Sequence, residues 1–298
     1  MANPSHSDIQ NMALFCDFEN VALGVRDAKY AQFDIRKVLE RLLVKGDIVV
    51  KKAYCDWERY KDFKKGMHEA AFELIEIPHV RQSGKNSADI RMVVDALDLC
   101  YTKAHVDAFV IISGDSDFSP LVSKLRENNK TVIGVGVRSS TSDLLVGNCD
   151  EFIFYDDLVK AEEAKRKSVV RKQAEAATKK SADAAARKQK EQASRKPNEK
   201  KSANEDLPAS DAPEEARRLE AIELVIDTVE ALLNERDLDE VHASIVKNAL
   251  KRRRPDFVES AYGYKAFGKI LEDAEKRGLL SIQRHGQAIA VSLPPAPT

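Results

Sequence analysis

The sequence lacks the paired cysteines that build zinc sites and disulfide frameworks and the long apolar runs that build membrane spans. It has one tryptophan and four cysteines in 298 residues, and the cysteines stand far apart with no CxxC pair. This spacing argues against a zinc site and a disulfide framework, so we expect reduced thiols. No stretch reaches the roughly 18 consecutive apolar residues that a membrane helix needs. We therefore expect a cytoplasmic protein that does not contact a membrane.

An excess of charge of one sign is also missing. Lys and Arg number 48, Asp and Glu number 49, and the formal net charge at pH 7 is −1. The whole molecule therefore gives no electrostatic argument for a polyanionic partner, and such an argument has to rest on local clusters. With 43% hydrophobic residues, the chain is long enough and apolar enough for two domains with their own cores.

A change in composition separates the two predicted domains, 12–158 and 214–293. Between them, residues 159–213 consist mainly of Ala, Lys, Glu, Ser and Gln, with no aromatic residue. Such a segment cannot form a core, and we interpret it as a charged linker, disordered or partly helical. Its 15 basic and 9 acidic residues fit either a solvated spacer or a weak tether for a polyanion such as RNA. Residues 1–11 and 294–298 are expected to be tails.

The first domain has the pattern of an α/β fold. Short apolar runs alternate with amphipathic stretches, which is typical of βα units around a mostly parallel sheet. We predict a Rossmann-like parallel sheet with helices on both faces. The predicted strands are 13–16, 48–54, 73–80, 108–113, 131–137 and 151–154. The predicted helices are 33–45, 88–101 and 118–128, the last with Asp117 as its N-cap and Pro120 in its first turn.

The second domain has three stretches of helical periodicity followed by two short strands. The apolar residues recur at helical spacing over 219–229, 241–250 and 267–274. Two strands, 279–282 and 288–293, are expected on either side of a turn at 284–286. This order predicts a small winged-helix-like α+β domain.

Acidic residues at the ends of predicted strands are the main functional signal. Asp17 follows the first strand, Asp115 and Asp117 follow the fourth, and Asp89 opens the helix after the third. In an open parallel sheet, neighbouring strand ends meet in one crevice where the strand order reverses. A single Asp at a strand end commonly caps a helix. Four acids placed in this way predict a shared acidic site.

A cluster of carboxylates fits a divalent cation. Carboxylates held within a few ångström repel one another, and protonation or a bound cation relieves the repulsion. Oxygen ligands favour Mg²⁺ or Mn²⁺, and such a site activates water for in-line attack on a phosphodiester. We therefore predict Asp17, Asp89, Asp115 and Asp117 as metal ligands and catalytic residues. Supporting roles are expected for Asn20, Ser113, Ser116 and Asp95, and a phosphate contact for Lys85.

Three blocks in the first domain resemble those of NYN domains, which belong to the PIN-like nuclease superfamily. The blocks are ALFCDFEN at 13–20, KNSAD at 85–89 together with Asp95, and SGDSDFSPLV at 113–122. The resemblance covers about half of the chain, and it implies a PIN-type sheet with an acidic metal site and ribonuclease activity. Mapped onto this sequence, the site again falls on the four Asp residues, with Asn20 in support. Many relatives have glycine near positions 86–87, so the loop before Asp89 is expected to differ.

The second domain is similar to OST-HTH (LOTUS) domains. The similarity lies in VHASIVK at 241–247, RRRPDF at 252–257 and AYGYKAFGKILE at 261–272. It implies RNA binding, or in some relatives docking of a protein partner. A compact basic cluster with nearby aromatic rings would serve the first role, although it would also suit a solvated helix end. The expected RNA-contacting residues are Lys251, Arg252, Arg253, Arg254, Tyr262, Tyr264 and Lys265.

Three functions compete on these grounds. The favoured hypothesis is a metal-dependent endoribonuclease to which the second domain recruits RNA. The alternative is a catalytically silent RNA-binding regulator with the same pocket. A phosphoacceptor receiver domain is disfavoured, because its acceptor Asp would stand alone after strand three, whereas the paired acids here follow strand four. A homo-oligomer is compatible with each of them.

Overall fold

The computed structural model describes residues 10–77, 87–164, 212–236, 238–285 and 288–294. The chain divides into one compact unit formed by residues 1–155 and 212–298 and a second unit formed by residues 156–211. Most of the expected linker, most of both expected tails and the loop with Lys85 lie outside the described residues. The first tail is shorter than expected, because Gln10 and Asn11 belong to the first strand. In the ranges that are described, no helix has the length and apolar character needed to cross a membrane.

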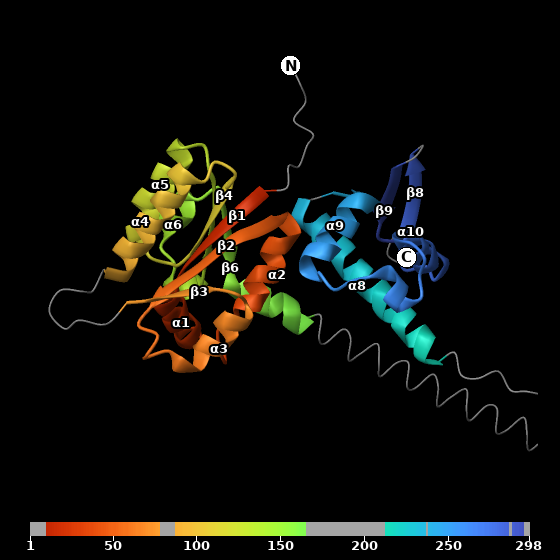
Figure 1. The fold of residues 1–298 in the computed structure, drawn as a ribbon, viewed down its shortest axis with the longest axis horizontal. Helices are drawn as coiled ribbons and strands as arrows, with labels where there is room; N and C mark the ends of the chain where they lie inside the picture. Colours follow the sequence, from red (N-terminus) through yellow and green to blue (C-terminus); the bar gives the residue numbers. More distant parts are fainter. Residues whose placement is uncertain (1–9, 78–86, 165–211, 237, 286–287, 295–298) are drawn as a thin grey trace, which may run out of the picture. The chain divides into compact units, whose positions relative to one another are not determined.

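The predicted six-stranded parallel sheet is confirmed (Figure 1). Its strand order is β3-β2-β1-β4-β5-β6. The central strands β1 and β4 are almost entirely buried, as expected for strands covered on both faces. The chain runs outward in one direction from β1 and in the other from β4, so these two strands form the switch point of the sheet. The bounds are β1 (Gln10–Asp17), β2 (Gly46–Cys55), β3 (Glu73–Glu76), β4 (Ala108–Ile112), β5 (Thr131–Gly136) and β6 (Glu151–Phe154).

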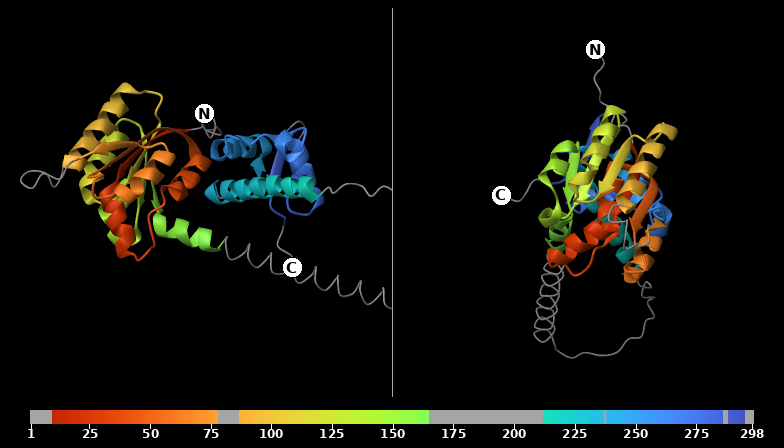
Figure 2. Two further views of the ribbon diagram at one scale, coloured as in Figure 1. Left: turned by 60° about the horizontal axis from the view of Figure 1, so that its bottom comes forward. Right: turned by 90° about the vertical axis from the view of Figure 1, so that its left-hand side faces the viewer.

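Helices cover both faces of this sheet (Figures 1 and 2). On one face lie α1 (Phe18–Asp27), α2 (Ile35–Lys45) and α3 (Lys61–Glu69). On the other face lie α4 (Ser87–Thr102), α5 (Ser119–Glu127) and α6 (Asp143–Asn148). The three predicted helices correspond to α2, α4 and α5, whereas α1, α3 and α6 were not predicted.

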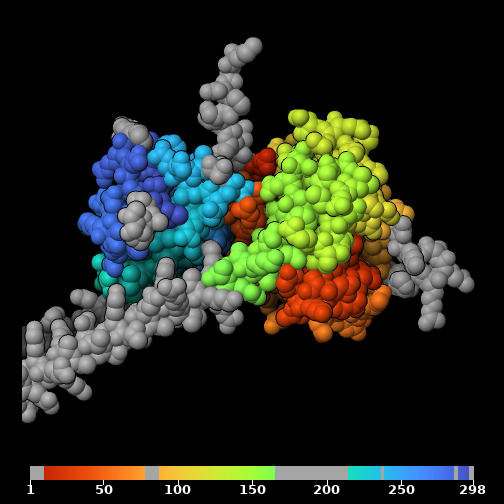
Figure 3. All heavy atoms as spheres, turned by 180° about the vertical axis from the view of Figure 1, so that it is seen from behind, coloured from red at the N-terminus to blue at the C-terminus, as the bar shows by residue number. Residues whose placement is uncertain are grey.

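The face that carries α4 is packed with aromatic and apolar side chains of the two central strands. Phe15 of β1 and Phe109 of β4 stack with their ring centroids 6.0 Å apart, and Met92 and Ala96 of α4 belong to the same buried cluster. The alternation of side chains along β1 therefore presents one set of residues to α4. Seen from behind, the green surface, which includes β6 and continues to residue 164, lies beside the red surface of the N-terminal part of the sequence (Figure 3).

The region after residue 212 has the predicted order of three helices followed by a hairpin. Its helices are α8 (Ala212–Arg236), α9 (Ala243–Arg253) and α10 (Phe267–Lys276). The hairpin is formed by β8 (Ser281–His285) and β9 (Ala288–Ser292), and the short β7 (Val241–His242) adds a third strand in the order β7-β9-β8. Phe267, Ile270 and Leu271 of α10 are buried in its core.

Candidate active site at the strand ends

Asp17 ends β1 and caps α1. Its side chain is buried and accepts two hydrogen bonds, one from the backbone N–H of Asn20 at 3.3 Å and one from Ser113 Oγ at 3.0 Å. The register explains the second bond, because Cys16 is paired with Ile112 and the next residues along are Asp17 and Ser113. The ends of the two central strands therefore meet in a direct side-chain contact.

Asn20 fixes the turn that follows β4. Its Oδ1 accepts a hydrogen bond from the Gly114 N–H at 2.9 Å, and the Gly114 carbonyl accepts one from the Ser142 N–H at 2.9 Å. A Cβ on Gly114 would lie 2.3 Å from the carbonyl oxygen of Ser140, so this position has no room for a side chain. The close approach of two backbone segments explains the glycine between strand and turn.

Asp115 caps the short 3-10 turn Ser116–Phe118, which precedes α5. Its Oδ1 accepts a hydrogen bond from the Asp117 N–H at 3.0 Å, and its own N–H donates to Ser113 Oγ at 3.2 Å. The prediction that Asp117 is the N-cap of α5 was wrong. The helix begins at Ser119, its N-cap residue Phe118 makes no side-chain cap bond, and the intervening turn takes its cap from Asp115 instead. Pro120 lies in the first turn of α5, as predicted.

The pKa shifts of the acids indicate that residues from separate chain segments lie near one another. Burial and, to a lesser extent, the Asp89 carboxylate raise the pKa of Asp17, and the hydrogen bonds from Ser113 and Asn20 oppose the rise, so that the pKa is about 7. Burial also raises the pKa of Asp89, followed by repulsion from Asp115 and Asp117. Acids from β1, α4 and the turn after β4 therefore act on one another, as expected when like charges share a crevice.

Glu19 also belongs to this group and was not singled out from the sequence. It contributes to the raised pKa of Asp89 and forms an ion pair with Arg59 at 3.3 Å. The feature that could have identified Glu19 is its position two residues after Asp17, in the first turn of α1. That helix was not predicted from the sequence. Without that helix, the direction of its side chain could not be inferred.

The donor set fits a hard divalent cation, although it is not arranged as a coordination sphere. Carboxylates that raise one another's pKa lack compensating positive charge, and oxygen ligands match Mg²⁺ or Mn²⁺. In the part of the chain that the structure describes, no group of three or more His, Cys, Asp or Glu side chains is placed to hold a metal ion. The capping bonds of Asp17 and Asp115, together with mutual repulsion, account for the lack of a gathered set of ligands.

Asp95 lies in a separate polar network. It accepts hydrogen bonds from Tyr54 Oη at 2.9 Å, Lys52 Nζ at 3.4 Å and Arg91 Nε at 3.0 Å. These three partners, rather than an acid of the crevice, determine its position. Ser116 lies next to Asp117 on a groove beside the crevice.

The predicted basic cluster of the second domain is divided between internal and exposed positions. Arg252 Nε donates to the carbonyl of Leu43 at 2.9 Å, and Arg253 Nη1 donates to the buried Thr228 hydroxyl at 3.2 Å. Lys251 and Arg254 are exposed. Two of the four cations are therefore engaged by protein groups.

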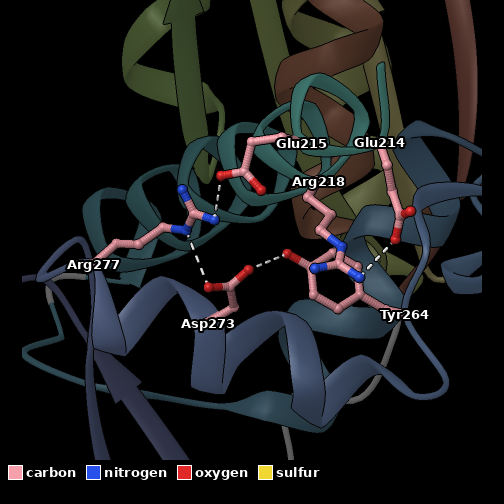
Figure 4. Close-up of polar contacts among 6 residues, drawn as sticks. All are labelled: Glu214, Glu215, Arg218, Tyr264, Asp273 and Arg277. Atoms are coloured by element: carbon pink, nitrogen blue, oxygen red, sulfur yellow. Dashed lines mark hydrogen bonds and ion pairs between the residues drawn. The ribbon is translucent and has the colours of Figure 1, made fainter. Parts of the chain in front are cut away.

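The predicted aromatic contacts are divided in a similar way (Figure 4). Tyr264 is buried, its hydroxyl donates to Asp273 Oδ2 at 2.6 Å, and the Arg218 guanidinium lies 5.8 Å from its ring centroid. Arg277 links Asp273 to Glu215 with hydrogen bonds of 3.0 and 2.7 Å. This network commits the Tyr264 ring to the interior of the domain.

The other two residues of that segment are more accessible. Tyr262 is half-buried and stacks on Phe257 with the ring centroids 5.1 Å apart. Lys265 is exposed. Together with Lys251 and Arg254, it leaves three exposed cations among the residues expected to contact RNA.

Comparison with known proteins places the first domain in a family. Residues 11–158 match the NYN domain. The uncharacterized protein MJ0482 of Methanocaldococcus jannaschii is 26% identical over 148 residues, which are 48% of this chain and 58% of that protein. A crystal structure of the protein of unknown function VPA0982 from Vibrio parahaemolyticus is 27% identical, covers 53% of this chain and 98% of its own, and superimposes with a TM-score of 0.46. This chain therefore carries an NYN domain, a domain of the PIN-like nuclease superfamily, at residues 11–158.

Proposed function

We propose that the protein is a metal-dependent endoribonuclease that hydrolyses RNA phosphodiesters at the crevice of its NYN domain. The observation that carries this proposal is the set of mutually repelling acids at the switch point of the sheet, where burial raises the pKa of Asp17 to about 7. Carboxylates held this close repel one another when all of them are ionised, and a bound divalent cation relieves that repulsion. The family of the domain supports a nucleic-acid substrate.

In this proposal the acids have distinct roles. Asp89, Asp115 and Asp117 would hold Mg²⁺ or Mn²⁺, and Asp17 would complete the site in its ionised form. The ion, when bound, would supply activated water and neutralise charge on the phosphate oxygens. Ser113 holds Asp17, and Asn20 holds the Gly114 backbone, so both residues fix the relative positions of the two strand ends. Their task is to keep the ligands in place as the ion binds.

We further propose that the region after residue 212 is an OST-HTH domain that recruits RNA. Its sequence resembles that family, and Lys251, Arg254 and Lys265 are exposed cations that can contact phosphates. Three exposed cations in an otherwise balanced domain would bind RNA weakly. They would therefore raise the local concentration of RNA rather than select a sequence.

The decisive experiment is a cleavage assay with purified full-length protein. Labelled single-stranded and hairpin RNA are incubated with Mn²⁺, with Mg²⁺ or with EDTA. We expect ion-dependent cleavage that falls by about 100-fold or more in Asp115→Asn, because the loss of one charged ligand removes several kcal/mol of transition-state stabilisation. Asp98→Asn, an exposed carboxylate on α4, is the matched control and should cleave like the wild type. Equal cleavage by Asp115→Asn would rule out this site.

A second candidate function, a regulator that binds RNA without cleaving it, is favoured by one observation. Both carboxylate oxygens of Asp17 already accept hydrogen bonds, from Asn20 and Ser113, so this residue also has a purely structural role as a cap. The cleavage assay separates the two candidates. RNA that is bound tightly by the wild type but left intact with every ion tested would establish the regulator.

A further inference from the structure

A groove runs along the α4 side of the acidic crevice. Its volume is about 730 Å³, within the range of small-molecule sites in proteins. Helix α4 contributes Ile90, Val93 and Val94, the start of α5 contributes Ser119 and Pro120, and α6 contributes Leu144. Ile90, Val94 and Leu144 are each more than half exposed. Three large aliphatic side chains thus gather around one hollow on the surface.

This groove is continuous with the proposed active site. Asp89 and Asp117, two of the four acids, line it as well. A ligand whose phosphate is held at the acids therefore has its neighbouring group at the entrance to the groove. None of the described residues that line the groove is basic, so it suits an uncharged group rather than another phosphate.

Ser119 gives an independent sign of a ligand. The residue is 7% exposed and lines the groove, and its Oγ has no hydrogen-bond partner among the described residues. Its carbonyl, in contrast, accepts a hydrogen bond from the Ser123 hydroxyl at 3.1 Å. A buried hydroxyl without a partner is costly, and native structures keep few of them. This oxygen is fully buried, so a polar group in the groove would satisfy it once the Ser119 side chain had rotated toward the groove.

We infer that the groove is a nucleobase subsite, which holds one unstacked base of RNA beside the phosphate bound at the acids. This inference rests on the proposed function. The faces of the base pack against Ile90, Val94 and Leu144, and its polar edge bonds to the Ser119 hydroxyl. Apolar packing combined with a few hydrogen bonds to the edge is the way in which proteins hold a base outside a helix. A base paired in a duplex has no free face, so the subsite selects single-stranded RNA.

Two substitutions test the subsite. Val94→Phe fills the groove from an exposed position, and Ser119→Ala removes the hydroxyl that would bond to the base. Val49→Phe, the same change at another exposed position of the NYN domain, is the matched control. Ser119→Ala should not lower the melting temperature, because it removes a buried polar group that has no partner. Normal melting of both groove variants separates loss of binding from loss of folding.

The measurement is photo-crosslinking of full-length protein. An RNA 12-mer with 4-thiouridine at one position after another is irradiated with the protein in Ca²⁺, and the crosslinked peptides are mapped by mass spectrometry. We expect one position to crosslink to α4 or to the start of α5. The yield should fall about tenfold in Val94→Phe, which is the loss of one base contact, and should be unchanged in Val49→Phe. Ser119→Ala should give a smaller decrease.

The outcomes separate the subsite from the nuclease. Crosslinks in the groove without cleavage by the wild type would contradict the nuclease and support the subsite. Cleavage that depends on Asp115, with crosslinks only outside the groove or with equal yields in Val94→Phe, would overturn the subsite alone. Size-exclusion chromatography in which Val94→Phe dissociates a wild-type dimer would also overturn it, because the aliphatic surface would then be a contact between copies.

Discussion

The acidic crevice and the basic run of the second domain, residues 251–254, are both groups of like charge that the sequence predicts to act together, but the fold arranges them differently. The acids come from chain segments nearly one hundred residues apart, and yet the segments meet: Ser113 donates a hydrogen bond to Asp17. The Asp115 carboxylate also raises the pKa of Asp89. The four basic residues are consecutive, and yet Arg252 and Arg253 bond to protein groups while Lys251 is exposed. Proximity in the sequence was the poorer guide to a shared surface.

Geometry explains this contrast. Successive residues of an α-helix are turned by about 100° from one another, so four consecutive side chains point around the whole helix. Lys251 to Arg253 end α9, and Arg254 is its C-cap. The carboxyl ends of parallel strands, by comparison, meet at one edge of the sheet wherever their residues stand in the chain.

The largest expected effect that tests this comparison is the effect of Asp17 ionisation on the stability of the metal-free protein. Its pKa in the folded protein is about 7, against an ordinary value of 3.8, a difference that corresponds to about 4 kcal/mol. Because the folded form holds the proton more tightly, this contribution to stability is fully present below about pH 4 and is lost as pH rises through 7. In EDTA, Asp17→Asn should therefore exceed the wild type in stability at pH 8 but not at pH 4.

Urea unfolding of both proteins between pH 4 and pH 8 measures this difference. Asp98→Asn serves as the control for the removal of a carboxylate that is exposed on α4. If Asp17→Asn and the wild type lose stability in parallel as pH rises, then Asp17 does not have a raised pKa in the folded protein.

A somewhat smaller effect is expected from divalent ions. Mn²⁺ binds only the folded form and relieves repulsion among the acids, so at 100 times its dissociation constant it should add about 2.7 kcal/mol of stability. The gain should be larger at pH 8 than at pH 6, since the ion competes with the proton of Asp17. Calorimetric titration and thermal melting should both lose the effect in Asp115→Asn. Equal Mn²⁺ binding by that variant would contradict the metal site.

A smaller effect, a roughly tenfold loss of RNA affinity, is expected from changes in the basic run. Replacing the exposed Lys251 and Arg254 with Ala should weaken RNA binding and reduce the slope of log affinity against log salt by about 1.4, at about 0.7 for each phosphate contact on a single strand. Arg253→Ala removes a charge from the same run, but this residue bonds to buried Thr228. It should lower the melting temperature and leave the salt slope nearly unchanged.

Fluorescence anisotropy at several salt concentrations measures both affinity and slope. A double variant that binds RNA with the affinity and slope of the wild type would identify the second domain as a protein-docking module. A large loss of slope in Arg253→Ala would instead mean that the run acts as one surface, and the contrast with the acidic crevice would disappear.

Much of the fold could be predicted from the sequence, because hydrophobic periodicity determines which residues are buried. All six strands and the helices α2, α4 and α5 correspond to predicted segments. Helix α1 was missed because it begins at Phe18 directly after β1, and Asp17 both ends the strand and caps the helix. A pattern with no loop between two elements gives no boundary to detect.

The site was less predictable than the fold, because side-chain partners depend on tertiary contacts. Strand order predicts that Asp17 and Ser113 meet, but not that Asp115 rather than Asp117 provides the cap after β4. The intervening 3-10 turn has no signal in the periodicity. The burial of Tyr264 beneath Arg218 likewise depends on packing between α8 and α10, which a local motif does not encode.

The smallest predicted effect concerns Asp95, which tests where the acidic site ends. Its carboxylate bonds to Tyr54, Lys52 and Arg91, and two cations already compensate its charge. Asp95→Asn should therefore change the catalytic efficiency of RNA cleavage by less than about threefold, while lowering stability by about 1 kcal/mol through the weakened hydrogen bonds. Kinetics at saturating Mn²⁺, with thermal melting alongside, measure both quantities. A loss of cleavage as deep as that of Asp115→Asn would place Asp95 among the residues that hold the ion, and the crevice would extend nearly two turns further along α4.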